Sequence, residues 1–187
     1  MTVYYERLRQ MVMDPAVLTH SAEPIKLASG EMSRDFIDGK LAVDDPDDLD
    51  FVGAAMCDAA SSKGIDFDAV GGLVLGAVPF AFAVAGIARC KWFFIRKETK
   101  GRGTNRRTEG ARIEPGMRVM VVDDVVTSGG SIRQACEYLL EQGAQVVFAT
   151  TLVDRGDIAT KYFEEVGIPY VPMLTYKDLD IDPVGSR

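Results

Sequence analysis

The feature that most restricts the fold of this 187-residue chain is an alternation of short apolar runs with longer segments from residue 66 onward. The apolar runs are expected to be strands, at 69–75, 92–96, 118–123, 145–152 and 169–173. The segments between them are expected to be helices, at 78–88, 129–141 and 158–166. Apolar strands separated by helices are typical of a parallel sheet covered on both faces. The pattern predicts an α/β fold with an open, mainly parallel sheet flanked by helices.

The first 45 residues have a different character. Helical spacing of apolar residues predicts a helix over residues 3–13, and residues 25–39 are short, polar segments punctuated by glycine. Asp45 followed by Pro46 is typical of a helix start. Because no repeat or low-complexity linker is present, we expect a single domain over residues 1–187. Its N-terminal helix and small flap would reach to about residue 45, and its α/β core would span about 46–187.

Net charge restricts the ligands that this chain could bind. There are 21 Lys and Arg against 28 Asp and Glu, a formal charge of −7, which argues against a general nucleic-acid binder. Between Lys91 and Arg112, however, eight basic residues stand against two acidic ones. A cationic segment on an anionic body suits the capture of a small anion rather than a long polyanion.

Cysteine use and hydropathy bear on location. Cys57, Cys90 and Cys136 are an odd, widely spaced set, and His20 is the single histidine, so neither a disulfide framework nor a structural zinc site is expected. The N-terminus is charged where a signal peptide needs an apolar run. Residues 69–88 carry no charge, but four glycines and a proline within them disfavour a membrane span. We therefore expect a cytoplasmic protein without a membrane association.

The segment 118–131, RVMVVDDVVTSGGS, carries the sharpest chemical signal. It places Asp123 and Asp124 at the end of a buried strand, and ligands of open α/β sheets bind outside such ends. The loop 127–131 can turn N–H groups and hydroxyls toward one phosphate at the positive end of a helix. Two carboxylates would repel that phosphate unless they bind ribose hydroxyls, a divalent cation, or both. An Asp pair that only caps the helix is the alternative, but the complete spacing is more specific.

That complete spacing resembles the ribose-phosphate signature of the type I phosphoribosyltransferases. The run IRKETKGRGTNRRTEG at 95–110 resembles the catalytic loop of the orotate phosphoribosyltransferases, although a solvated basic loop is the alternative interpretation. In that family the loop reaches across a dimer into the neighbouring site. Weaker resemblances are the flap over the orotate ring at 27–38, the diphosphate-contacting loop at 70–79 and the arginine-supplying element at 153–155.

The resemblance implies a type I phosphoribosyltransferase fold and a Mg²⁺-dependent orotate phosphoribosyltransferase of pyrimidine nucleotide biosynthesis. Such an enzyme converts 5-phosphoribosyl 1-diphosphate and orotate into orotidine 5′-monophosphate and diphosphate. Asp123, Asp124 and Lys100 would be the catalytic residues, with Mg²⁺ held mainly through substrate near the two aspartates. A mobile loop at about 98–110 would act in the neighbouring subunit of a homodimer. Substrate contacts would come from Lys26, Phe36, Ile37, Arg96, Lys97, Arg102, Val125, Val126, Thr127, Ser128, Gly129, Gly130, Ser131 and Arg155.

Three positions depart from the family pattern. Arg102 stands where many members have histidine, and Ala28 and Ala77 stand where some have lysine. These changes leave two alternatives open: a phosphoribosyltransferase for another nucleobase, or a non-catalytic ligand-sensing regulator on the same fold. Retention of Lys97 and Lys100 argues against the regulator.

The remaining conspicuous side chains have structural explanations. The aromatic run at 92–94 is expected to contribute to the core and to a dimer contact rather than to stack on a base. Cys136 is expected to pack on the buried stripe of its helix, and His20 to lie on the surface.

Overall fold

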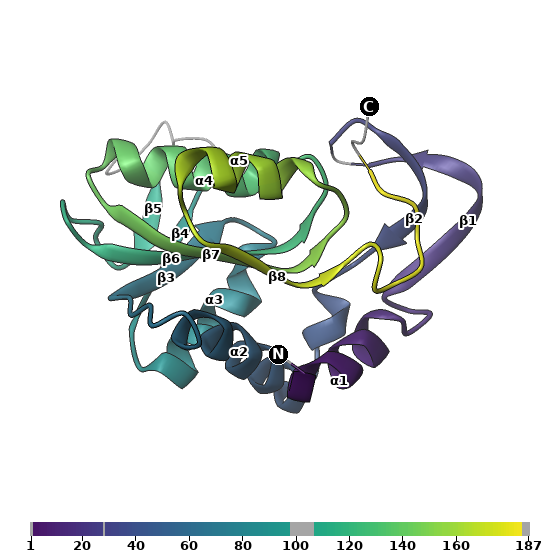
Figure 1. The fold of residues 1–187 in the computed structure, drawn as a ribbon, viewed down its shortest axis with the longest axis horizontal. Helices are drawn as coiled ribbons and strands as arrows, with labels where there is room; N and C mark the ends of the chain where they lie inside the picture. The colour runs from purple at the N-terminus through teal and green to yellow at the C-terminus, as the bar shows by residue number, and fades with distance from the viewer. Residues whose placement is uncertain (1, 28, 98–106, 185–187) are drawn as a thin grey trace.

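The computed structural model describes residues 2–27, 29–97 and 107–184. Its main sheet has six strands in the order β5-β4-β3-β6-β7-β8 (Figure 1). All neighbours in it are parallel except β5, which pairs antiparallel with β4 at one edge. The strands are β3 (Ala69–Leu73), β4 (Lys91–Ile95), β5 (Thr108–Gly110), β6 (Arg118–Val126), β7 (Gln145–Asp154) and β8 (Tyr170–Thr175). The mainly parallel sheet expected from the sequence is confirmed.

Strand boundaries differ from expectation in the region that matters most. The first core strand ends at Leu73 rather than residue 75, whereas β6 and β7 are longer than expected. Pairing between β6 and β7 continues as far as Val126 opposite Asp154. The acidic pair therefore lies within β6, not at its end, because neighbouring strands extend the hydrogen bonding past the carboxylates. The short strand β5 was not expected.

Helices cover both faces of the sheet (Figure 1). On one face lie α2 (Pro46–Ser61) and α3 (Ala77–Ala88), with α1 (Thr2–Val12) beside them, and on the other lie α4 (Gly130–Glu141) and α5 (Ile158–Val166). Successive side chains of a strand point to opposite faces. Accordingly, β6 contributes alternate residues to the two hydrophobic clusters, one under each helical layer.

Local sequence explains where these helices begin and end. The Asp45 side chain accepts a 2.8 Å hydrogen bond from the N–H of Asp47, and Pro46 is the first helical residue of α2, as predicted. In α4 the expected stripe is buried, Cys136 included, except that Leu140 is 47% exposed. Gly143, just past that helix, has a φ of 80°, which glycine adopts without strain.

A hairpin whose strands lie between residues 18 and 37 replaces the short polar segments expected at 25–39. Its strands β1 (Leu18–Lys26) and β2 (Met32–Ile37) are antiparallel, and the 3₁₀ turn η1 (Leu41–Val43) leads on to α2. The hairpin lies beyond the carboxyl ends of β6 and β7 (Figure 1). Most β1 side chains are exposed, so the strand lacks the apolar alternation that would have predicted it.

The structure shows where the uncharged segment 69–88 and the three cysteines lie in the fold. Within the described ranges, no helix is long and apolar enough to cross a membrane, and residues 69–88 form β3, a turn and α3. The three cysteines are free thiols, with Cys136 buried in the core.

Candidate active site

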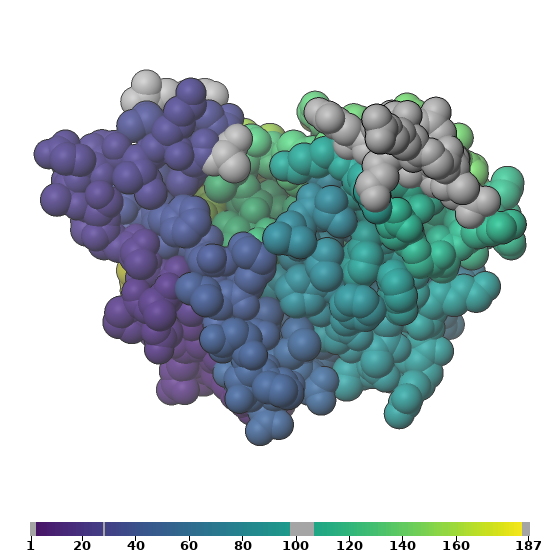
Figure 2. Space-filling view, turned by 180° about the vertical axis from the view of Figure 1, so that it is seen from behind, coloured from purple at the N-terminus to yellow at the C-terminus, as the bar shows by residue number. Residues whose placement is uncertain are grey.

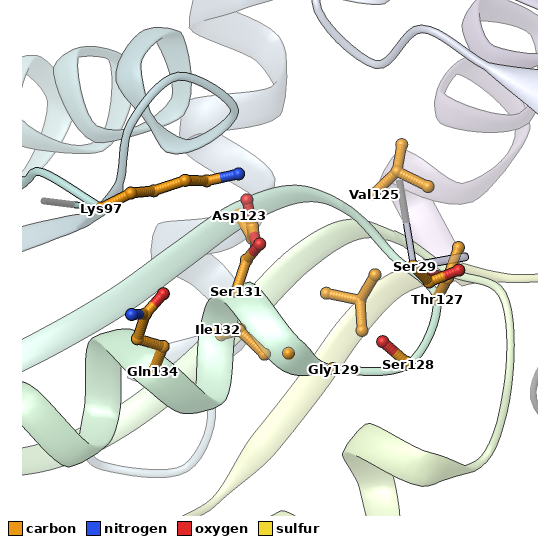
Figure 3. A pocket seen from close by; sticks show the side chains of 12 residues that line it. Ser29, Lys97, Asp123, Val125, Thr127, Ser128, Gly129, Ser131, Ile132 and Gln134 are labelled. Carbon is orange, nitrogen blue, oxygen red and sulfur yellow. The ribbon is translucent and has the colours of Figure 1, made fainter. Parts of the chain in front are cut away.

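Two adjoining pockets open at the carboxyl ends of the central strands. Figure 2 shows the hollow in which they lie, between the purple-blue N-terminal hairpin and the teal part of the chain. The loop pocket, about 260 Å³, is lined by Ser29, Lys97, Asp123, Gln134 and residues 125–132 (Figure 3). The flap pocket, about 240 Å³, is lined by residues of the hairpin, of the loop after β3, and of β6 and β7. Both pockets share Lys97, Asp123, Val125, Thr127 and Ser131.

The loop pocket is built around the start of α4. The helix begins at Gly130, so the unpaired N–H groups of its first turn and its positive dipole end lie at the pocket wall. Gly129 precedes it with a φ of 74°, and a Cβ at this position would lie 3.4 Å from Ala159. A turn of this kind followed by a helix N-terminus, with hydroxyls from Thr127, Ser128 and Ser131, is suited to a phosphate group.

The acidic pair lies where the two pockets meet: Asp123 lines both pockets, and Asp124 lines the flap pocket. Asp123 is 4% exposed and accepts a 3.1 Å hydrogen bond from the N–H of Asp124. Burial raises the pKa of Asp123 well above its usual range, the charge of Asp124 raises it further, and Lys97 opposes the shift. Figure 3 shows Lys97 extending over the loop pocket toward Asp123. Burial and the neighbouring carboxylate thus both favour the protonated form of Asp123.

Glycines make room for Asp124. A Cβ on Gly76 would lie 2.3 Å from Asp124 Oδ1, and one on Gly39 would lie 3.1 Å from Asp124 Cβ. Ala77, the position at which some family members have lysine, is fully buried in α3. The residue of this loop that lies against the acidic pair is thus Gly76, not Ala77.

Lys40, in the turn that follows the hairpin, is a cation that contacts Asp124. Lys40 Nζ lies 2.6 Å from Asp38 Oδ1 and 3.5 Å from Asp124 Oδ2. Burial by itself would lower the pKa of Lys40, but the hydrogen bond to Asp38 and the charges of Asp124 and Asp38 together raise it. The Lys40 hydrogen bond in turn lowers the pKa of Asp38. Lys40 is therefore charged at neutral pH.

Arg155, directly after β7, lines the flap pocket. Its side chain is 1% exposed and donates from NH1 to the carbonyl oxygen of Asp35 at 2.6 Å and from NH2 to Ser33 Oγ at 3.1 Å. Its Nε is buried and has no hydrogen-bond partner among the described residues. Burial lowers the pKa of Arg155, and the charge of Asp35 counteracts this. The arginine thus joins the end of β7 to the hairpin and leaves one buried N–H without an acceptor.

The structure brings most of the predicted site residues together. Asp123, Arg155, the run 125–131, Lys97, Phe36 and Ile37 line one or both pockets, and Asp124 lines the flap pocket. Two predicted contacts lie elsewhere: Lys26 is an exposed residue at the end of β1, and Arg96 pairs with Glu109 on β5. Lys100, Arg102, Ala28 and residues 98–106 of the expected loop lie outside the described residues.

Sequence reasoning missed several lining residues. Lys40 was not identified because its contact with Asp124 joins distant parts of the chain, and Gln134 because it sits on the polar side of an amphipathic helix. For Lys40 the one local signal was its place directly after the Phe36–Asp38 resemblance. Ile132 was missed as well. The segments 27–38 and 70–79 were assigned to the site, but their lining residues were not named individually: Leu27, Ser29, Leu73, Val74, Leu75 and Gly76.

The donor set fits a divalent cation that is held partly by substrate. Among the described residues, no three His, Cys, Asp or Glu side chains are grouped so that they could hold a metal ion. Asp123 and Asp124 are two carboxylates beside a phosphate-type pocket. Mg²⁺ is commonly bound by one or two carboxylates together with substrate phosphates and water.

Fold and site together define a class of protein. A parallel sheet with an acidic pair in one central strand, a phosphate-type loop at the next helix and a hairpin over the strand ends is the arrangement of the type I phosphoribosyltransferases. Comparison with known families agrees, since the family described as "Phosphoribosyl transferase domain" matches residues 51–162.

Curated relatives and solved structures narrow this class. The orotate phosphoribosyltransferase of Methanothermobacter thermautotrophicus is 40% identical over 154 residues, 82% of this chain and 83% of the relative. That of Aquifex aeolicus is 35% identical over 179 residues, 93% of this chain and 96% of the relative. The structure of Mycobacterium tuberculosis orotate phosphoribosyltransferase in complex with 5-phospho-α-D-ribosyl 1-diphosphate has a TM-score of 0.73 at 28% identity, covering 95% of this chain and 99% of that one. The chain belongs to the orotate phosphoribosyltransferase family.

Proposed function

We propose that this protein transfers the phosphoribosyl group of 5-phosphoribosyl 1-diphosphate to orotate. The products are orotidine 5′-monophosphate, a pyrimidine nucleotide precursor, and diphosphate. The observation that carries the proposal is that the two pockets adjoin at the acidic pair and share five lining residues: Lys97, Asp123, Val125, Thr127 and Ser131. A phosphate-type site and a site for a flat anionic base thereby adjoin and share part of their lining.

The unpartnered Nε of Arg155 supports orotate as the base. Orotate carries a carboxylate, and a buried N–H that lacks an acceptor costs free energy until a ligand supplies one. Arg155 lines the flap pocket together with Phe36 and Ile37 of the hairpin. A base bound there would lie against the backbone of β2 with its carboxylate toward Arg155.

The ribose phosphate would occupy the loop pocket. Residues 125–131 would hold the 5′-phosphate, and Asp123 and Asp124 would accept hydrogen bonds from the ribose 2′ and 3′ hydroxyls. Mg²⁺, held mainly by the substrate diphosphate near these carboxylates, would neutralise charge on the diphosphate when bound. Lys97 would contact the diphosphate from the side of β4.

The chain's contribution to rate is positioning and electrostatics. The family's transition state places positive charge on the ribose and negative charge on the departing diphosphate. Asp123 and Asp124 would lie near the positive charge on the ribose. Lys97 and the basic residues after it, with Lys100 as the leaving-group residue, would stabilise the negative charge on the diphosphate. No protein nucleophile is needed, and orotate brings an acidic ring N–H, so a general base is dispensable.

A homodimer is part of the proposal. Phe82 on α3 and Trp92 on β4 are 45% and 37% exposed, and their ring centroids lie 4.9 Å apart. Phe94 packs against both rings. Exposed aromatic groups of this kind favour a protein contact, and a second copy seated there would allow the loop at 98–110 to reach the neighbouring site. Free thiols suit the cytoplasm as its location.

The base can be tested directly against the two alternatives. Purified protein with Mg²⁺ and 5-phosphoribosyl 1-diphosphate is offered orotate, uracil, adenine or hypoxanthine, and diphosphate release is measured. We expect release with orotate only. Release with another base would favour the transferase for that base, and silence with all four despite binding of the phosphoribosyl donor would favour the regulator.

A further inference from the structure

Lys40 is a charged side chain in the site to which the family resemblance gives no role. It follows the hairpin and precedes η1, and its ammonium bridges Asp38 at 2.6 Å and Asp124 at 3.5 Å. The Lys40 side chain is 42% exposed, so it stands at the mouth of the flap pocket rather than in the core. The bridge joins the hairpin turn to the central strand β6.

The backbone around Lys40 is fixed in the place that this bridge requires. Its own N–H donates to Asp38 Oδ1 at 3.2 Å, and the N–H of Leu41 donates to the Asp38 carbonyl at 3.1 Å. Gly39 passes so close to β6 that a Cβ would lie 3.1 Å from both Asp124 Cβ and Val125 Cγ2. The turn is therefore seated against Asp124 before the lysine side chain is considered.

Asp124 has little freedom left except at its carboxylate. Its N–H donates to Asp123 Oδ1, and its carbonyl accepts a 2.8 Å hydrogen bond from Thr151 Oγ1. Oδ1 lies beside Gly76, where no side chain intervenes, and Oδ2 faces Lys40. Among the described residues, the Lys40 ammonium is the cation in contact with this carboxylate.

We propose that Lys40 is a positioning residue, which orients the Asp124 carboxylate for the ribose hydroxyls and couples that orientation to the seating of the hairpin. This inference rests on the proposed function. A carboxylate held in one rotamer presents both hydroxyl acceptors without first losing side-chain freedom, and a displacement of about 1 Å in a reacting group can cost about 100-fold in rate. Lys40 itself acts through Asp124, not through the substrate.

The first test compares Lys40→Gln and Lys40→Arg with Lys63→Gln, an exposed lysine after α2 that lines neither pocket. Lys40→Gln is expected to lower kcat/KM for 5-phosphoribosyl 1-diphosphate by about 10- to 100-fold, with a smaller change in KM for orotate. Lys40→Arg, which keeps the charge, is expected to retain most of the wild-type value, and Lys63→Gln all of it. Equal melting temperatures show that the variants are folded. An unchanged Lys40→Gln enzyme, or a failure of Lys40→Arg to restore rate, overturns the inference.

The second test separates positioning from direct contact with substrate. Single-turnover rates with excess enzyme are measured for Asp124→Asn and for the double variant Lys40→Gln/Asp124→Asn. If Lys40 acts through Asp124, its substitution adds little in the Asp124→Asn background. Multiplicative losses overturn the inference. A wild-type enzyme without orotate turnover would overturn the proposed function itself, a result distinct from an active wild type that is indifferent to Lys40.

Discussion

Arg155 NH1 donates a 2.6 Å hydrogen bond to the carbonyl oxygen of Asp35, a residue 120 positions earlier in the chain. This bond ties the residue that follows β7 to strand β2 of the hairpin, and NH2 adds a second bond to Ser33 on the same strand. The hairpin therefore sits over the strand ends because a fully buried guanidinium holds it there. The same side chain lines the flap pocket, and its buried Nε has no hydrogen-bond partner among the described residues.

Replacement of Arg155 by lysine tests this arrangement. Lysine is a point charge and cannot bond Asp35, Ser33 and a ligand carboxylate in one planar geometry. We expect Arg155→Lys to raise KM for orotate by about 10- to 100-fold, the equivalent of about 1.5–3 kcal/mol for a hydrogen bond to a charged group. The affinity for 5-phosphoribosyl 1-diphosphate, measured by calorimetry, is expected to change far less. Equal losses for both substrates would show that Arg155 acts only through the fold.

Gly76 is expected to tolerate no side chain. An added Cβ would meet Asp124 Oδ1 at 2.3 Å and Asp123 Oδ1 at 2.9 Å, so the acidic pair would have to move. Gly76→Ala should weaken binding of 5-phosphoribosyl 1-diphosphate at least about tenfold, as measured by calorimetry. The matched control is Gly86→Ala on α3, where nothing lies within 4 Å, and alanine should stabilise the helix by about 0.5–1 kcal/mol. Wild-type affinity in Gly76→Ala would contradict the placement of the pair.

Asp154 gives the fold a pH dependence unrelated to catalysis. It is buried beside Arg155 and accepts hydrogen bonds from the N–H of Gly156 and the hydroxyl of Tyr170, both at 3.1 Å. Burial, the largest influence, raises its pKa to about 6. The folded state thus favours the protonated acid, and this contribution to stability is complete below about pH 4 and is lost as pH rises through about 6.

The Asp154→Asn variant isolates that contribution. Between pH 4 and pH 7, the free energy of unfolding of the wild type should fall by about 1–3 kcal/mol relative to that of Asp154→Asn, as measured by urea denaturation. Other titrating groups, Asp123 among them, cancel in the difference between the two proteins. Parallel pH profiles would show that Asp154 keeps the same pKa in the folded and unfolded chains.

The exposed aromatic cluster predicts how the subunits associate. Phe82→Glu places a charge among Trp92 and Phe94 and should convert a dimer into monomers, as measured by light scattering. If the loop works in the neighbouring site, the monomer should also lose turnover. Leu140→Glu, which adds a charge to an exposed position on α4, is the control and should leave both properties unchanged. A monomeric but fully active Phe82→Glu protein would rule out a loop that acts across subunits.

Lys100 is expected to matter for the leaving group. Lys100→Ala should lower kcat by about 100-fold or more, the scale of a lost electrostatic contact to developing charge, while affinity for 5-phosphoribosyl 1-diphosphate changes little. Rapid-quench kinetics of diphosphate formation measure the chemical step. Intact turnover in Lys100→Ala, combined with lost ligand binding in Asp124→Asn, would contradict the role assigned to the loop.

Local pattern was sufficient for the central sheet but not for the hairpin. The residues of β6 are apolar on both faces of the strand, a pattern typical of a strand buried between two layers of helices. The sequence therefore predicted that helices cover both faces of the sheet. In β1 most side chains face solvent, and the strand forms because it pairs with β2, which Arg155 in turn ties to the core. Propensity carries no information about such partners.

The site likewise contains some residues that the local sequence predicted and others that it did not. Asp123, Asp124 and the loop up to Ser131 are contiguous in sequence, so their spacing predicted a phosphate-type pocket. Lys40 and Gly76 reach Asp124 only after the chain has folded around β6. Ala77, which stands where some family members have lysine, is buried in the core. Contacts between distant segments are set by packing, which spacing along the chain does not encode.

The central claim is tested most directly by the near-ultraviolet absorbance of orotate. Purified protein is mixed with orotate and Mg²⁺, and absorbance is followed before and after addition of 5-phosphoribosyl 1-diphosphate, with the product identified by mass. The account predicts no change before addition and a catalytic fall afterwards, with one orotidine 5′-monophosphate formed per orotate lost. Constant absorbance from a folded dimer that binds both substrates would contradict it.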